Sequence, residues 1–112
     1  MARGINKVIL IGIVEMGPEV KYTLSGKAVI NFVLAVKEDQ HNGRVNKHTD
    51  WFYIEARGRG AEFMGQHLHK GDYIYLEGVM RSSKWEKDGI TYYTSKILVR
   101  DFLFLSMNSI SV

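Results

Sequence analysis

The sequence predicts an all-β domain of five strands with one short helix between the third strand and the fourth. Several stretches alternate between apolar and polar residues, as half-buried strands do, and residues 61–70 change to helical spacing. The 112 residues contain no cysteine, no repeat and no linker-like segment. We therefore expect a single domain over residues 1–112, with an ordered core over about residues 3–105.

The first strand is predicted over residues 5–14, where isoleucine and valine dominate. This stretch is shorter than the roughly 20 apolar residues that a membrane-spanning helix needs, and it lacks the small-residue cleavage site of a signal peptide. Gly17-Pro18 and Ser25-Gly26 follow and indicate turns before the second strand. The protein is therefore expected to be soluble and cytoplasmic.

Two alternating strands are predicted next, over residues 27–37 and 49–57. In residues 49–57 the apolar face carries Phe52, Ile54 and Ala56, and the opposite face carries Trp51, Tyr53, Glu55 and Arg57. The polar residues 38–48 between the two strands contain Asn42-Gly43, which predicts an exposed loop or a hairpin tip.

The helix and the last two strands complete the domain. Ala61, Met64 and Leu68 fall at helical spacing, and Gly71 is the predicted C-terminal stop. Residues 72–85 return to strand spacing, with inward positions at Ile74, Leu76 and Met80 and outward positions at Tyr73, Tyr75, Arg81 and Trp85. Lys87-Asp88-Gly89 predicts a hairpin turn into a last strand over about residues 90–105.

This order of elements is the pattern of an OB-fold, a five-stranded and partly open Greek-key barrel that often binds oligonucleotides. In this fold we expect the helix between strands 3 and 4 to close one end of the barrel.

Trp51 and Trp85 are the most informative residues, because each is a large aromatic beside cationic side chains on a strand face opposite the apolar residues. A base can stack on an exposed indole while a nearby Arg or Lys contacts its phosphate. The pattern therefore favours binding of single-stranded nucleic acid. The alternative, that the two tryptophans pack in a subunit interface, stays open.

The composition favours binding over catalysis. The chain has 15 Lys and Arg against 12 Asp and Glu, a formal net charge of +3 and a mild bias toward polyanions. It contains no cysteine and no GxSxG, HExxH or GxxxxGK[ST] motif, so we expect no enzyme. His67 and His69 are two residues apart and would point to different faces of a helix, so no metal or other cofactor is expected.

Motifs across residues 3–105 carry a family resemblance. In the first half they are Ile5-Asn6-Lys7-Val8-Ile9-Leu10-Ile11-Gly12, Pro18-Glu19-Val20-Lys21-Tyr22, Ser25-Gly26, Ala28-Val29, Phe32 and Leu34-Ala35. In the second half they are Thr49-Asp50-Trp51, Leu68, Lys70-Gly71, Ile74-Tyr75-Leu76-Glu77-Gly78, Arg81, Lys84-Trp85 and Tyr93-Thr94. In this order and spacing they resemble bacterial single-stranded DNA-binding proteins, the SSB family, in a short form without the acidic C-terminal tail.

The resemblance implies an OB-fold homotetramer that wraps single-stranded DNA around its outer surface without marked sequence specificity. Such a protein would be nucleoid-associated and would protect exposed strands during replication, recombination and repair. The resemblance puts base stacking on Trp51 and Trp85, with Tyr22 as a lesser contact. It puts phosphate contacts on Arg3, Lys7, Arg59, Lys70 and Lys84. Strand alternation adds Arg57 and Arg81, which are predicted to point to the same outer face as the tryptophans.

Two positions and the C-terminal end depart from the family pattern. Gln40 stands where better-known members carry an aromatic residue, and Arg57 replaces a stacking phenylalanine. A guanidinium can stack on a base and pair with a phosphate, so binding is expected to depend more on charge and to fall more steeply with salt. Members usually end in an acidic tip that recruits replication and repair proteins, but no acidic residue follows Asp101, so recruitment through such a tip is not expected.

Two alternatives stay open for assembly and function. Residues 8–11 are apolar on both strand faces, which favours a neighbouring subunit over a fully buried strand in a monomer. The alternative function is that of a dimeric OB-fold accessory protein, similar to primosomal replication-restart proteins, which bridges DNA and replication proteins. A tetramer that occludes a long stretch of DNA supports the first function, and a dimer with a short footprint supports the second.

Overall fold

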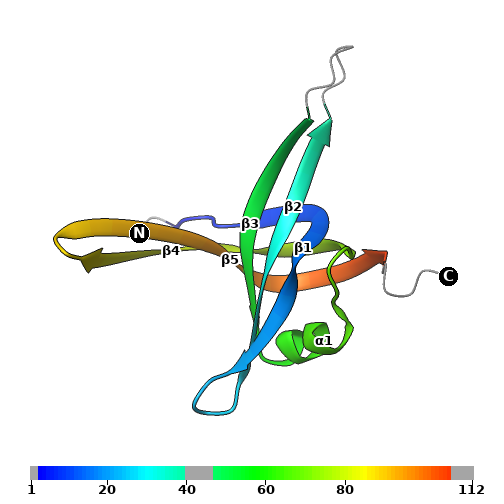
Figure 1. Cartoon of the computed structure of the whole chain (residues 1–112), viewed down its shortest axis with the longest axis horizontal. Helices are drawn as coiled ribbons and strands as arrows, with labels where there is room; N and C mark the ends of the chain where they lie inside the picture. The colour runs from blue at the N-terminus through cyan, green and yellow to red at the C-terminus, as the bar shows by residue number, and fades with distance from the viewer. Residues whose placement is uncertain (1–2, 40–46, 107–112) are drawn as a thin grey trace.

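The computed structural model describes residues 3–39 and 47–106, which form five strands and one helix (Figure 1). The elements are β1 (Val8–Tyr22), β2 (Ala28–Asp39), β3 (Lys47–Arg57), α1 (Arg59–His67), β4 (Tyr73–Lys87) and β5 (Ile90–Ser106). The strands form a closed barrel in the order β1-β2-β3-β5-β4. The predicted OB-fold, with its helix between the third and fourth strands, is confirmed.

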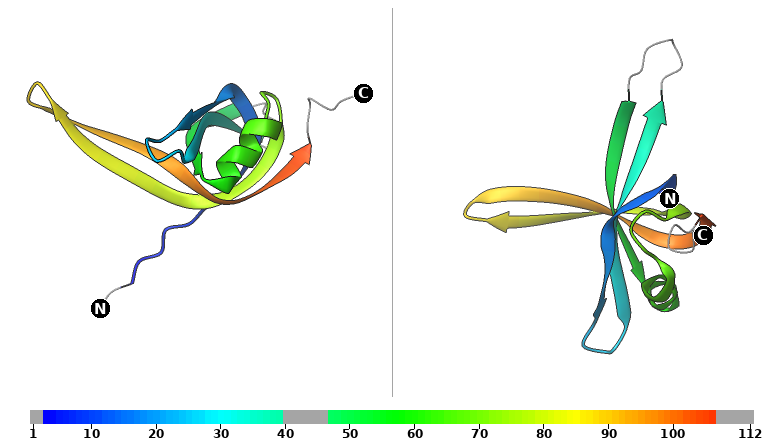
Figure 2. Two further views of the ribbon diagram at one scale, coloured as in Figure 1. Left: turned by 90° about the horizontal axis from the view of Figure 1, so that it is seen from below. Right: turned by 45° about the vertical axis from the view of Figure 1, so that its right-hand side comes forward.

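The barrel closes because β1 pairs with two neighbours. The part of β1 from Val8 to Ile13 runs antiparallel to β4, and the part from Ile13 to Tyr22 runs antiparallel to β2. On the other side, β3 and β5 meet in a short parallel contact, with Ile54 opposite Ile97 and Glu55 opposite Leu98. From this contact the β2–β3 and β4–β5 hairpins diverge as two arms, which Figure 1 and the right-hand view of Figure 2 show.

Aliphatic side chains from the strands fill the barrel, and α1 covers one of its ends. Ile30, Leu34 and Ile54 are at most 1% exposed. From α1, Ala61 and Met64 belong to the same core, and the left-hand view of Figure 2 shows the helix across the barrel opening. The core residues of α1 therefore fall at the predicted helical spacing.

Gly17-Pro18 is not a turn between strands, and this prediction is wrong. Both residues lie inside β1, where the register with β2 shifts between Val14 and Met16 and again between Met16 and Glu19. Such irregularities bend a strand and increase its twist. The bend lets one long strand leave β4 and continue along β2, so the turn-forming residues serve barrel closure.

The end of the helix and the orientation of Met80 also differ from the prediction. α1 ends at His67, and Leu68 is already extended; Gly71, with φ 96°, turns the chain toward β4 instead. Met80 is 39% exposed because β4 leaves the barrel after a register shift between Glu77 and Gly78. Beyond that point the strand still alternates, but the barrel core no longer lies beneath it.

The two other turn predictions are confirmed. Gly26 has φ 85° in the turn between β1 and β2. Asp88 and Gly89 have φ 53° and 75°, which are the positive angles of a tight hairpin turn. Asn42-Gly43 and Gln40 lie outside the described residues.

Candidate nucleic-acid interface

Three neighbouring strands present one outer face, formed by β3, β5 and β4. Alternate residues of a strand share a face, so β3 places Trp51, Tyr53 and Glu55 on it. On the β4–β5 arm the same face carries three cross-strand pairs, which are Arg81 with Lys96, Ser83 with Thr94 and Trp85 with Tyr92. The Lys96 ammonium reaches Glu55 of β3, which joins the two parts of the face.

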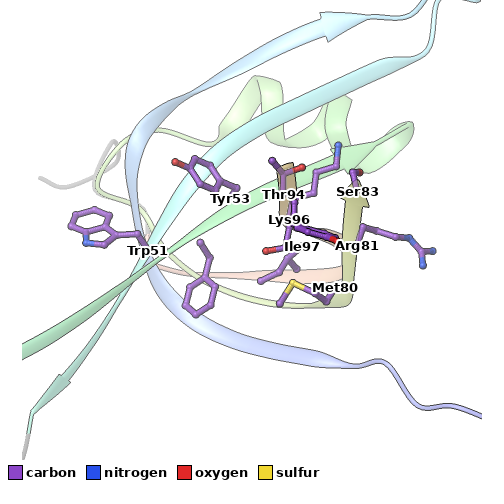
Figure 3. Close-up of a pocket in the computed structure, with 11 residues that line it drawn as sticks. Trp51, Tyr53, Met80, Arg81, Ser83, Thr94, Lys96 and Ile97 are labelled. Carbon is purple, nitrogen blue, oxygen red and sulfur yellow. The ribbon is translucent and has the colours of Figure 1, made fainter. Parts of the chain in front are cut away.

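A groove of about 730 Å³ lies where β3 separates from the β4–β5 arm (Figure 3). Its lining residues are Trp51, Phe52, Tyr53, Met80, Arg81, Ser83, Tyr93, Thr94, Ser95, Lys96 and Ile97. Trp51 and Tyr53 are 59% and 69% exposed, so their rings are open to a planar partner. Exposed aromatic rings, apolar side chains and two cations thus line one groove.

Trp85 lies on the β4–β5 arm and does not line this groove. Its indole stacks on the ring of Tyr92 across the hairpin, with the ring centroids 4.4 Å apart and the planes 18° apart. Trp85 remains 45% exposed. Since Tyr92 covers one face of the indole, the opposite face is the one that can receive a base.

Lys84 does not share a face with Trp85. Adjacent residues of a strand point to opposite sides, and the register puts Lys84 opposite Tyr93 while Trp85 is opposite Tyr92. The tryptophan therefore has Arg81 and Lys96, not Lys84, as the cations on its own side of the arm.

Glu55 is the buried charge of the outer face, at 5% exposed. The Arg57 Nε donates to its Oε2 at 2.6 Å, and the Lys96 Nζ donates to its Oε1 at 2.6 Å. Burial by itself raises the pKa of Glu55, but the hydrogen bonds and positive charges of Lys96 and Arg57 outweigh it, so the pKa lies below its ordinary value. Glu55 is therefore an anion at neutral pH, and Arg57 is engaged with it.

The other predicted residues lie away from the groove. The Lys7 Nζ is 3.2 Å from the Glu77 carboxylate on the β1–β4 side of the barrel. Tyr22, at the end of β1, is 67% exposed. Arg3, Arg59 and Lys70 are exposed at the start of the described chain, at the start of α1 and in the turn before β4. Among all the predicted residues, Trp51 and Arg81 are the two that the groove brings together.

Sequence reasoning missed Tyr53, Tyr92, Tyr93 and Lys96 as members of this surface. The alternation that exposes Trp51 also exposes Tyr53, so the signal for Tyr53 was present. Tyr92 and Lys96 needed the β4–β5 register, which matches them with Trp85 and Arg81. The Lys96 contact with Glu55 spans 41 positions and depends on the parallel meeting of β3 and β5.

Two further kinds of site are not found within the described residues. Within residues 3–39 and 47–106, no three His, Cys, Asp or Glu side chains are grouped as metal ligands would be. No helix in this part of the chain is long and apolar enough to cross a membrane.

The chain is similar to known single-stranded DNA-binding proteins in sequence and in structure. A sequence model of the single-strand binding protein family matches residues 5–105. The solved structure of a Plasmodium falciparum SSB in complex with ssDNA aligns over 95% of this chain and 99% of that chain, with a TM-score of 0.84 and 26% identity.

Two structures of the single-stranded DNA-binding protein from Thermus aquaticus, the wild type and a deletion mutant, align with TM-scores of 0.81. They are 30% and 31% identical to this chain and align over 96% and 97% of it. The alignments cover 53% and 54% of the Thermus chains, so this chain spans about half their length.

These findings confirm the resemblance inferred from the motifs, and the family is one of DNA-binding proteins without enzymatic activity, as the composition led us to expect. Because the family match covers nearly all of the described barrel and the solved structures share its fold, the chain belongs to the single-strand binding protein family.

Proposed function

We propose that this protein binds single-stranded DNA with low sequence selectivity and protects it during replication, recombination and repair. The observation that carries the proposal is the groove in which Trp51 and Tyr53 lie with Arg81 and Lys96 on the fold of this family. A DNA complex is known for the similar Plasmodium falciparum SSB. Exposed single strands arise at the nucleoid, so we propose that the protein acts there.

Base stacking is the first contribution to binding. Trp51 and Tyr53 offer two exposed rings in the groove, and Trp85 offers one face of its indole on the adjoining arm. Stacking of a base on an aromatic side chain stabilises a complex by about 1–3 kcal/mol and tolerates every base. Three such platforms support a proposal of binding that depends little on the base sequence.

Phosphate contacts are the second contribution. Arg81 and Lys96 lie on the face that carries the aromatic rings. Arg3, Lys7, Arg59, Lys70 and Lys84 are exposed elsewhere on the described surface and can extend the path of the strand around the barrel. Lys7 would have to exchange Glu77 for a phosphate. Because each phosphate contact releases counterions, affinity should fall steeply with salt.

A homotetramer is the proposed assembly. Ile9 and Ile11 are 54% and 44% exposed on β1, and Leu103 and Leu105 are 60% and 41% exposed on β5. Because β4 lies between β1 and β5, with Tyr75 opposite both Ile11 and Leu103, these side chains gather on one apolar side of the barrel. A second copy of the chain is the partner that this surface suits.

The test is a titration of the protein with oligo-dT, followed by tryptophan fluorescence at several salt concentrations and repeated with duplex DNA. We expect quenching by the single strand, weaker affinity for the duplex and a strong decrease in affinity with salt. Equal affinity for both DNAs, or no quenching by the single strand, would contradict the proposal. Native mass spectrometry with and without a long oligonucleotide distinguishes the tetramer from a dimeric accessory protein.

A further inference from the structure

Glu55 places a negative charge inside a surface that is otherwise suited to an anionic ligand. Each of its carboxylate oxygens accepts from a different cation, Oε2 from Arg57 on β3 and Oε1 from Lys96 on β5, both at 2.6 Å. Two positive charges and one negative charge leave this cluster with a net charge of +1. The Lys96 contact depends on how β3 meets β5, whereas Arg57 lies two residues from Glu55 on the same strand, so the complete cluster forms only where the two strands come together.

Lys96 connects two grooves on the described surface. Besides the groove that contains Trp51, it lines a smaller one of about 170 Å³ beside Met16, Asn31 and Val33. Tyr53 and Lys96 are the residues that both grooves share. A strand that runs from one groove to the other passes the ring of Tyr53, and a base stacked there brings its phosphate toward the Lys96 ammonium.

Both cations can bind a phosphate while they hold Glu55. Their side chains are 41% exposed for Lys96 and 56% exposed for Arg57. An ammonium has three N–H donors and a guanidinium has five, and each uses one of them in the hydrogen bond to Glu55. The carboxylate therefore holds the two cations in position and leaves each of them with N–H groups that can donate to a phosphate.

We propose that Lys96, which lines both grooves, and Arg57, which shares Glu55 with it, form a phosphate-binding subsite, and that Glu55 positions both cations and weakens the subsite by offsetting one of their charges. The inference rests on the proposed binding of single-stranded DNA and adds the pairing of Lys96 with Arg57 around one carboxylate, whose negative charge limits affinity. Limited affinity at one point of the path allows the protein to be displaced from DNA that must be copied or repaired.

The test measures binding of a fluorescently labelled oligo-dT by anisotropy over a range of salt concentrations. Glu55→Gln keeps the size of the side chain, removes its charge and leaves one oxygen that can still accept from one of the two cations. We expect it to bind roughly threefold more tightly at low salt, the effect of one unit charge at roughly 7 Å in water, with a steeper salt dependence. Lys96→Gln should weaken binding and reduce the slope of log K against log salt by about 0.7, the value for one phosphate contact of a single strand.

Glu19→Gln is the matched control, because it removes the same charge from the same outer face. The register puts Glu19 and Glu55 on either side of Asn31 on the neighbouring strands. Glu19 lines the smaller groove, but it is exposed and its carboxylate pairs with Lys21 at 3.8 Å rather than with Arg57 or Lys96, so we expect less than half of the effect of Glu55→Gln. Glu55→Asp, which keeps the charge but is too short to hold both cations, should weaken binding.

The proposal is overturned if Glu55→Gln binds like the wild type or like Glu19→Gln, or if Lys96→Gln keeps the wild-type slope. Thermal melts establish that each variant is folded; if Glu55→Gln does not fold, Lys96→Gln alone decides, because it changes a partly exposed side chain. A wild-type protein that fails to bind oligo-dT refutes the proposed function itself, and that result is distinct from any difference among the variants.

Discussion

Replacing Trp85 by alanine should weaken binding of single-stranded DNA by about 5- to 150-fold. The indole is 45% exposed and stacked at 4.4 Å on Tyr92, so one of its faces is covered and one base at most can stack on the other. One base–aromatic stack is worth about 1–3 kcal/mol, and each 1.4 kcal/mol is about tenfold in affinity. Loss of a single stack gives the expected range.

The same substitution should cost the fold little. Trp85 lies on the β4–β5 arm, outside the barrel core, and its contact with Tyr92 is an exposed aromatic pair. Such pairs contribute about 0.5–1.5 kcal/mol beyond the area that they bury. The free energy of unfolding should therefore fall by that amount plus the contribution of the apolar area that Trp85 buries on the arm, and the subunit should stay folded because the barrel core is unchanged.

Anisotropy of a labelled oligo-dT is the suitable assay, because removal of Trp85 also removes an intrinsic fluorophore. Ile90→Ala is the matched control: Ile90 is 54% exposed on the same hairpin, but it has no aromatic ring on which a base could stack. It should bind like the wild type. A Trp85→Ala protein with wild-type affinity would refute the stacking argument. A variant whose oligomer dissociates while each subunit keeps its affinity for DNA would assign Trp85 to a subunit interface.

Three further predictions concern stability and assembly. A Cβ at Gly12 would lie 2.5 Å from the Ala35 carbonyl oxygen, so Gly12→Ala should lower the free energy of unfolding by about 1–3 kcal/mol in urea titrations; Gly17→Ala, whose Cβ would meet nothing within 4 Å, should not, and equal losses would contradict the packing argument. Because the pKa of Glu55 is lowered, its ion pairs stabilise the folded state above its ordinary pKa of 4.5 and are lost as the pH falls through the lowered value. The difference in free energy of unfolding between wild type and Glu55→Gln should therefore shrink in urea titrations below pH 4.5. A difference that stays constant with pH would contradict the stabilising role of the Glu55 ion pairs. Ile11→Lys should dissociate the oligomer in sedimentation experiments without unfolding the subunit, whereas an unchanged mass would place the interface elsewhere.

Local patterns in the sequence were sufficient to predict the order of the elements and the outward orientation of the tryptophans. Strand alternation reports which side chains are buried whatever the neighbouring strand is, so Ile54 and Ala56 were correctly separated from Trp51. The turn at Asp88-Gly89 was equally predictable, because only a few residues tolerate positive φ. The local pattern was misleading at Met80, since alternation continues where β4 has already left the barrel.

By itself the sequence determined the fold class, the family and the exposure of the two tryptophans, because these depend on short-range periodicity and on motifs in a fixed order. The tertiary structure decided which residues meet. In the structure Gly17-Pro18 lies inside a bent strand, and the Lys96 ammonium contacts Glu55. Trp85 lies opposite Tyr92 and does not share a strand face with Lys84. Such contacts depend on strand register and on barrel closure, which join segments that are far apart in the chain and whose pairing no local pattern specifies.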